Sequence, residues 1–341
     1  MRVATTSIPA AAGLRCPPLL LPFSPCAASP RSLRFLRLEQ RCSMSVVIAN
    51  YSCSSSSSSS SGTLNVGAVN VASTGVVGKN DLLIVGPGVL GRIVAEKWKK
   101  ENPDCQIVGI TMTADHHDEL IKLGVVPTLR GSPINKFPYL IFCAPPSRTE
   151  DYPGEVRLAA SNWSGEGSFL FTSSSAVYDC SDNGFCNEDS PVVPAGKSPR
   201  TDVLLKAENE ALAVGGCVLR LAGLYKADRG AHTFWLGKGT VDSRPDHIVN
   251  LIHYEDAASL AIAIMKRNLR GGIFNGCDDQ PLSRQELMDC VNRSKRYSKK
   301  FLGFTGSDGP LGKRMNNSKT RTQIGWQPKF TSFPQFLGLT D

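Results

Sequence analysis

Three glycines near residue 90 have the spacing of a turn that binds phosphate groups. Gly86, Gly88 and Gly91 form the pattern G-x-G-x-x-G, directly after the apolar run 81–85 and before an amphipathic segment. The first glycine allows a tight turn, the second lets a pyrophosphate approach the backbone, and the third lets a helix pack against the strand. In this context the pattern indicates a dinucleotide site, and a tight turn without a ligand is the alternative.

The residues after the turn should supply the remaining cofactor contacts. The amides of Val89 and Leu90 are expected to point at the pyrophosphate from a helix N-terminus. NAD sites usually place an acidic residue about 20 residues further on, where it holds a ribose hydroxyl. Here the next apolar run, 106–111, ends at Thr111 without an acid. Because Thr111 and Thr113 could bond a phosphate, the sequence favours NADP(H) over NAD(H).

Short apolar runs that alternate with amphipathic segments should position this turn. The runs are continuously apolar, which is typical of parallel strands covered on both faces. Helix-start signals lie between them, including Ser198-Pro199 and the capping box SRQE at 283–286. The alternation predicts an α/β fold with a doubly wound parallel sheet. The strand candidates are 81–85, 106–111, 139–144, 168–172 and 217–222.

Six segments of the chain carry a family resemblance. LLIVGPGVLG, FLFTSSSAVY, VLRLAGLY, NLIHYEDAA, IFNGCDD and IGWQPKF occur in this order. They resemble the extended and atypical short-chain dehydrogenase/reductases, which include nucleotide-sugar epimerases and dehydratases, and most of all an atypical plant plastid type known only as NAD(P)-binding or epimerase-like. The resemblance covers nearly all of 81–335. It implies a Rossmann domain with a small C-terminal lobe built from parts of 224–335, and a substrate site between the two.

The resemblance also implies roles for individual residues. Ser174, four residues before Tyr178, would orient a carbonyl or hydroxyl of the substrate. Ala144, Pro145 and Ala222 would lie beside the cofactor. A polar strand end is the alternative for Ser174, and a simple strand terminus is the alternative for Pro145.

The family's proton donor is absent from this sequence. In the family a Tyr lies four residues before a Lys on one helix, and the ammonium lowers the pKa of the phenol. Lys206 fits the Lys, but the Tyr position is then Asp202, which is an anion near neutral pH. If Glu208 sets the register instead, the pair becomes Arg200 and Leu204. The simpler interpretation of Asp202 and Lys206 is an i,i+4 ion pair on a solvated helix face.

Other candidate acids have structural interpretations. Tyr178 and Tyr225 are expected to be packed aromatic side chains. His253 and Asp256 resemble a helix start, with the carboxylate near the N-terminus. The His116-His117 pair lacks metal-ligand partners at useful spacing, so we expect no metal site.

The first 80 residues differ from the rest in composition. They hold seven basic residues and one acid, so the segment is +6 and the remainder of the chain is only +2. Residues 1–45 are rich in Ser, Ala, Pro and Arg, which predicts a transit peptide, for a chloroplast first and a mitochondrion as the alternative. A secretory signal and an untargeted disordered tail are the other interpretations of this segment. Its apolar patch PPLLLPF is too short to span a bilayer. Residues 46–80 are a Ser-rich linker expected to be disordered, and 336–341 are a tail.

Charge and cysteine content limit the classes of binding partner and the cellular compartment that the sequence favours. The near-neutral remainder gives no indication of nucleic-acid binding, and no segment predicts membrane insertion. The seven cysteines after residue 80 include no C-x-x-C, which favours a reducing compartment. The sequence does not indicate an oligomeric state.

Two functions are consistent with these features. The first is an NAD(P)(H)-dependent oxidoreductase or epimerase-like enzyme that acts on a small polar substrate, with Ser174 as the orienting group, Lys206 as a second catalytic candidate and an acid that the sequence does not identify. The alternative is a non-catalytic dinucleotide-binding sensor or partner-docking module, which the missing tyrosine favours.

Overall fold

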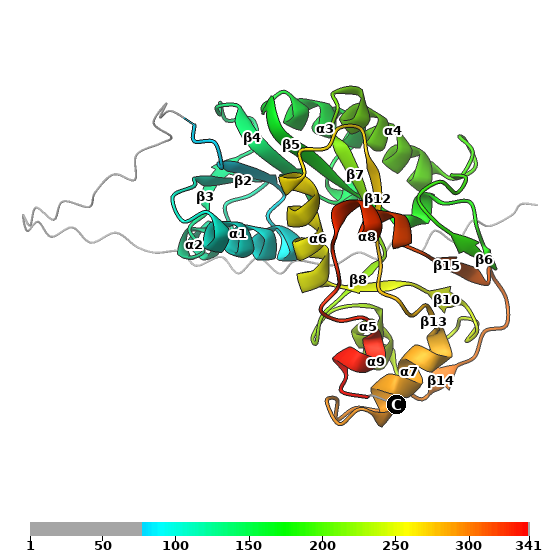
Figure 1. Ribbon diagram of the computed structural model, residues 1–341. Coiled ribbons are helices and arrows are strands. Elements are labelled where there is room, and N and C mark those ends of the chain that lie inside the picture. Colours follow the sequence, from blue (N-terminus) through cyan, green and yellow to red (C-terminus); the bar gives the residue numbers. More distant parts are fainter. Residues whose placement is uncertain (1–76, 340–341) are drawn as a thin grey trace, which may run out of the picture. The chain divides into compact units, whose positions relative to one another are not determined.

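The computed structural model describes residues 77–339 (Figure 1). The predicted transit peptide, nearly all of the predicted linker and the last two residues of the chain lie outside the described residues.

A seven-stranded sheet forms the centre of the described part, and all of its neighbouring strands pair in parallel. Its order is β12-β7-β5-β4-β1-β2-β3. This arrangement confirms the predicted doubly wound α/β fold, and each of the five predicted runs contributes a strand. The strands are β1 (Leu82–Val85), β2 (Ile107–Thr111), β3 (Val126–Leu129), β4 (Phe137–Phe142), β5 (Trp163–Ser174), β7 (Cys217–Leu221) and β12 (Ile273–Gly276).

Helices cover both faces of this sheet (Figure 1). Leu82 and Ile84 of β1 belong to one core cluster with α1 and α6, and Leu83 and Val85 belong to a second cluster with α3 and α4. Because successive side chains of a strand point to opposite faces, burial on both sides requires the continuous apolar runs seen in the sequence. The helices are α1 (Val89–Glu101), α2 (His117–Lys122), α3 (Tyr152–Ala160), α4 (Pro199–Ala213) and α6 (Tyr254–Lys266).

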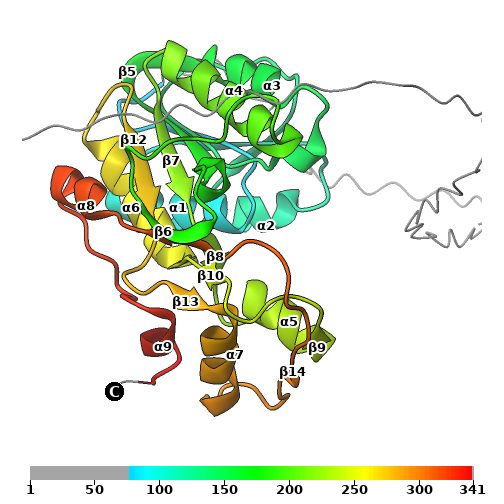
Figure 2. The same ribbon diagram turned by 90° about the vertical axis from the view of Figure 1, so that its right-hand side faces the viewer.

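Smaller sheets and helices form a lobe beside the main sheet (Figure 2). One sheet has four strands in the order β13-β10-β15-β6. The strands β8 and β11 form a separate parallel pair, and β11 follows β10 in the sequence. One strand, β6, comes from the segment between β5 and α4, outside the range predicted for the lobe. The lobe contains β6 (Asp182–Cys186), β8 (Gly223–Tyr225), α5 (Ala231–Lys238), β9 (Thr240–Val241), β10 (Ile248–Val249), β11 (Leu251–His253), β13 (Leu282–Ser283), α7 (Arg284–Arg293), β14 (Gly303–Phe304), β15 (Gly312–Met315) and α9 (Phe333–Phe336). The helix α8 (Ser318–Ile324) instead lies against β12 of the main sheet (Figure 1).

The predicted helix starts are confirmed by their hydrogen bonds. Ser198 caps α4 by accepting from the Thr201 amide, and Ser283 forms the capping box of α7 with Glu286. The seven described cysteines are free thiols. Among the described helices, none is both long and apolar enough to cross a membrane.

Candidate functional site at the carboxyl end of the parallel sheet

Two of the three glycines in the turn are required by the fold itself. Gly86 has φ +76°, and a Cβ at this position would lie 2.6 Å from the Cα of Ala144. A Cβ on Gly91 would lie 3.0 Å from Cγ2 of Ile84 on β1. These contacts bring α1 close to β1 and set β1 against the end of β4.

The fold does not require Gly88, the second glycine of the motif. Gly88 is exposed, has φ −76°, and a Cβ there would meet only the carbonyl oxygen of Gly86, at 4.0 Å. Gly88 is also the N-cap of α1, and no described side chain caps this helix end. The amides of Val89 and Leu90 therefore lie at an uncapped helix N-terminus, where an anion is stabilised.

The end of β2 is polar and internally bonded. Thr111 Oγ1 lies 2.8 Å from Nε2 of His117 and donates to the carbonyl oxygen of Thr128 at 3.4 Å. No acid occupies this strand end, as the sequence predicted. His117 thus supports Thr111 and is only partly exposed, whereas His116 is exposed as expected. Within residues 77–339, no group of three His, Cys, Asp or Glu side chains is arranged to hold a metal ion.

A cation that sequence reasoning missed lies beside the glycine turn. Arg92 follows Gly91, and its Nε donates to the carbonyl oxygen of Pro87 at 3.3 Å. Its guanidinium also pairs with Glu119 of α2. Hydrogen bonds from Arg92 and, to a smaller extent, from His116 lower the pKa of the Glu119 carboxyl. The sequence contains the signal for this cation, because the residue directly after Gly91 is basic.

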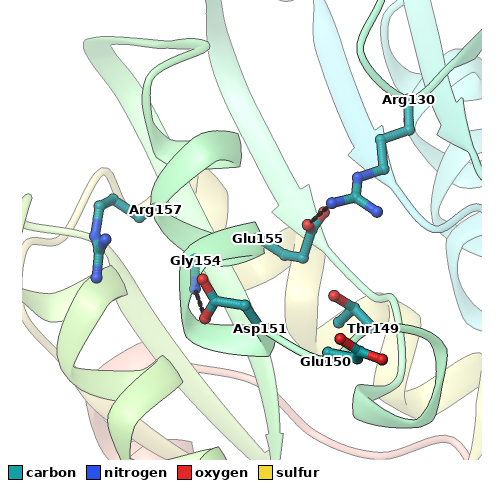
Figure 3. A pocket seen from close by; sticks show the side chains of 7 residues that line it. All are labelled: Arg130, Thr149, Glu150, Asp151, Gly154, Glu155 and Arg157. Carbon is teal, nitrogen blue, oxygen red and sulfur yellow. Dashed lines mark hydrogen bonds and ion pairs between the residues drawn. The ribbon is translucent and has the colours of Figure 1, made fainter.

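A shallow depression of about 650 Å³ lies next to the end of β2 (Figure 3). Arg130 connects the two, because its amide donates to the carbonyl oxygen of Thr111 at 2.9 Å. The depression has a mixed lining, with Arg130 paired to Glu155 and Asp151 capping α3 through the Gly154 amide. It is lined by Arg130, Thr149, Glu150, Asp151, Gly154, Glu155 and Arg157.

Ser174 ends β5 and is half-buried. Its Oγ accepts from the Ala176 amide at 3.2 Å and so caps a short 3-10 turn, Ser175–Val177. A structural role at a strand end is therefore present. Ala144 and Pro145 follow β4 and Ala222 follows β7, the two strands that flank β5, so these three residues and Ser174 lie at the carboxyl edge of the sheet. Ligands of open parallel sheets bind at this edge.

The expected Asp202–Lys206 ion pair does not form. The Asp202 carboxylate instead accepts from the Gly196 amide at 3.0 and 3.1 Å. Lys206 is exposed, whereas Leu204 and Glu208 are buried against the sheet. The register set by Glu208 is the one that buries the acid against the sheet, and in it Leu204 lies at the position of the family's Lys. Lys206 is exposed to solvent on α4, and its assignment to the catalytic site stays a prediction.

The two tyrosines are packed side chains, as predicted. Tyr178 is buried and its hydroxyl donates to Oδ1 of Asn275 at 2.8 Å, and burial raises its pKa to about 12. Tyr225 is fully buried. Its pKa is raised mainly by burial and also by the charge of Asp278. Neither phenol is positioned to give a proton to a ligand.

The His253–Asp256 cluster starts α6, as predicted. Nδ1 of His253 accepts from the Glu255 amide at 3.2 Å. The Asp256 carboxylate accepts from the amides of Lys329 and Phe330 at 2.7 and 3.0 Å. These contacts fix the C-terminal segment against α6.

Comparison with known proteins places the fold. No protein-family model matches the chain. A 170-residue stretch is 34% identical to protein YeeZ of Escherichia coli strain K12, and this stretch is 47% of the chain and 58% of YeeZ. The match thus spans less than two thirds of that relative.

Three solved structures illustrate the structural similarity. A functionally unknown conserved protein from Silicibacter pomeroyi has a TM-score of 0.62 at 23% identity, over 76% of this chain and 96% of that one. The dTDP-glucose 4,6-dehydratase from Bacillus anthracis, in complex with NAD, has a TM-score of 0.61 at 12% identity over the same shares. The UDP-glucuronic acid 4-epimerase from Bacillus cereus, in complex with UDP-glucuronic acid and NAD, has a TM-score of 0.60 at 16% identity, over 76% and 97%. The chain therefore has the Rossmann-like fold of NAD-dependent epimerases and dehydratases and is a distant homologue of YeeZ.

Proposed function

We propose that this protein binds NAD(P)(H) at the turn 86–91 and is an oxidoreductase or epimerase-like enzyme. The observation that carries this proposal is Gly88, an exposed glycine that the fold does not require, at the uncapped N-terminus of α1. The amides of Val89 and Leu90 would hold the pyrophosphate, and Ala144 and Ala222 would flank the rest of the dinucleotide. When bound, the dinucleotide would supply hydride transfer.

The residues at the end of β2 fit NADP(H) better than NAD(H). A ribose 2′-phosphate would find a hydroxyl at Thr111 and no carboxylate at the strand end. The guanidinium of Arg92, held beside the turn by the Pro87 carbonyl, supplies a positive charge nearby. Exchange of the Glu119 carboxylate for a ligand phosphate would allow Arg92 to make this contact.

The substrate proposed here is a small polar molecule bound beside Ser174. Two structural neighbours were solved with NAD, one of them also with UDP-glucuronic acid, so a nucleotide sugar is a reasonable first candidate. The lobe that contains β6, β10, β13 and β15 would supply the second wall that such a substrate needs. Ser174 would orient its carbonyl or hydroxyl group.

A non-catalytic dinucleotide-binding module is the second candidate. It is favoured by the absence of the family's Tyr from α4 and by the exposure of Lys206 to solvent. Stoichiometric NADPH binding with no turnover on a broad carbonyl panel would support the module. NADPH oxidation that is abolished by Ser174→Ala would support the enzyme.

The binding site is tested with Gly88→Val in the full-length chain. The new side chain has room in the protein but would occupy the space proposed for the pyrophosphate. We expect a small decrease in melting temperature, because valine is a poorer N-cap residue than glycine, and at least a 100-fold weaker NADPH affinity by isothermal titration. Gly237→Val, at an exposed position of α5 with equal room, is the matched control and should keep full affinity. A folded Gly88→Val protein that binds NADPH normally would show that the ligand site has been misplaced.

A further inference from the structure

A lysine from the lobe reaches the turn that follows Ser174. Lys313 lies on β15, and its Nζ donates to the carbonyl oxygens of Ser175 at 3.0 Å and Tyr178 at 2.7 Å. Ser175 begins the short turn that Ser174 caps, and Tyr178 is the C-cap residue of the same turn. An ammonium from the second lobe is therefore held within one turn of the proposed substrate-orienting hydroxyl.

The charge of Lys313 is not neutralised by a nearby acid. Its side chain is partly buried, and among residues 77–339 no carboxylate lies within 4 Å of its Nζ. Asp179, which influences it electrostatically, is instead bonded to Lys197 at 3.3 Å. Burial lowers the pKa of Lys313, although the thiols of Cys186 and Cys180 act in the opposite direction. Two carbonyl oxygens and the Tyr178 ring, whose centre lies 5.8 Å from Nζ, stabilise the ammonium without neutralising it. An anionic ligand would supply the missing counter-charge.

Both groups keep hydrogen-bonding capacity. An ammonium has three N–H donors, and the two carbonyls accept only two of them. The Ser174 hydroxyl accepts from the Ala176 amide and donates to no acceptor in the described part of the chain. One N–H donor and one O–H donor therefore lie at the same strand end, which is the edge where parallel sheets bind ligands.

We propose that Lys313 and Ser174 together bind an anionic group of the substrate, a carboxylate or a phosphate ester. This inference rests on the proposed function for its location, since both residues would face the substrate beside the dinucleotide. Lys313 neutralises the negative charge and donates one hydrogen bond, and Ser174 donates a second. In this proposal β15 supplies the positive charge beside Ser174, whereas Lys206 of α4 is exposed to solvent.

The proposal is tested by competitive acetylation of the full-length protein. Its lysines are labelled with limiting acetic anhydride, with and without 10 mM malonate or inorganic phosphate, and quantified by peptide mass spectrometry. We expect at least threefold slower acetylation of Lys313 with one or both anions, and no change at the exposed Lys206. Protection by malonate alone assigns a carboxylate, and protection by phosphate alone assigns a phosphate ester. Equal labelling of Lys313 under all conditions would overturn the proposal.

Two variants make the test independent of labelling chemistry. Lys313→Arg keeps the charge, whereas Lys313→Met keeps much of the side-chain length without it. The protecting anion should raise the melting temperature of the parent and of Lys313→Arg but not of Lys313→Met. A shift retained by Lys313→Met contradicts the proposal, and if that variant does not fold, the labelling result decides.

The experiment separates this site from the dinucleotide site. Anion protection of Lys313 is measured without dinucleotide and should persist in Gly88→Val, because the turn 86–91 makes no part of the anion site. Protection in a protein that does not bind NADPH would leave the anion site standing and reject the dinucleotide proposal. NADPH binding without anion protection of Lys313 would leave the dinucleotide proposal standing and reject the anion site.

Discussion

Arg220 Nη2 lies 2.7 Å from Oε2 of Glu208, and neither side chain is more than 5% exposed. The other carboxylate oxygen of Glu208 accepts from Oγ of Ser173 at 2.6 Å, so the pair joins α4, β7 and β5. Arg220 also lies 4.7 Å from the centre of the Tyr178 ring, beneath the turn that follows Ser174. This buried pair fixes the rotation of α4, which places Leu204 against the sheet and Lys206 in solvent.

Replacing Glu208 should cost far more stability than replacing its exposed neighbour on the same helix. Glu208→Gln leaves the Arg220 guanidinium buried without a counter-charge, so we expect a loss of about 3–5 kcal/mol in the free energy of unfolding. Glu210→Gln breaks the exposed pair with Arg157 and should cost about 0–1 kcal/mol. Urea unfolding monitored by circular dichroism measures both. Similar small losses would show that the buried pair does not determine the position of α4.

The parallel sheet and the glycine turn could be predicted because their physical requirements are local. A strand covered on both faces must be apolar at successive positions, as in 81–85 and 217–222. The tight turn requires Gly86 because a Cβ there would collide with Ala144, although the collision partner could not be identified from the sequence.

The register of α4 could not be predicted because it depends on tertiary contacts. Both Lys206 and Glu208 offered a plausible alignment in the sequence, and only the burial of Glu208 against Arg220 decides between them. Lys313 was missed for a related reason. It is 138 residues from Ser175 in the sequence, on a short strand without a strong apolar pattern, and only the lobe brings the two together.

Coenzyme preference should respond to an acid at the end of β2. In Thr111→Asp, a carboxylate would accept from the ribose hydroxyls of NAD and repel a 2′-phosphate. We expect the ratio of the NADP to the NAD dissociation constant to rise at least tenfold in isothermal titrations. Thr111→Asn introduces a side chain with the shape of aspartate but without its charge, and it should change the ratio by less than threefold. An unchanged ratio in Thr111→Asp would show that the adenosine ribose does not lie beside this residue.

Acid should destabilise the protein through its buried histidines. Burial lowers the pKa of His253 to about 4, and that of His232 to about 4 as well. In the unfolded chain a histidine has a pKa of about 6.5, so it gains a proton at a pH where the native side chain is still neutral. Stability from each histidine is therefore complete above about pH 6.5 and is lost as the pH falls toward 4. Urea unfolding at pH 7.5 and pH 5.5, of the parent and of a variant that lacks one of these imidazoles, isolates this loss.

His253→Asn isolates one of these groups. Asparagine is a favourable N-cap residue and can accept from the Glu255 amide as Nδ1 of His253 does, but it does not titrate. We expect the stability difference between parent and variant to be smaller at pH 5.5 than at pH 7.5 by about 1 kcal/mol. Burial raises the pKa values of Asp256 and Asp278, which acts in the opposite direction. Because both carboxyls are present in both proteins, their contribution cancels from this comparison. A difference that does not change with pH would mean that His253 is protonated in the native protein at pH 5.5, which its burial among Tyr225, Phe330 and Phe336 opposes.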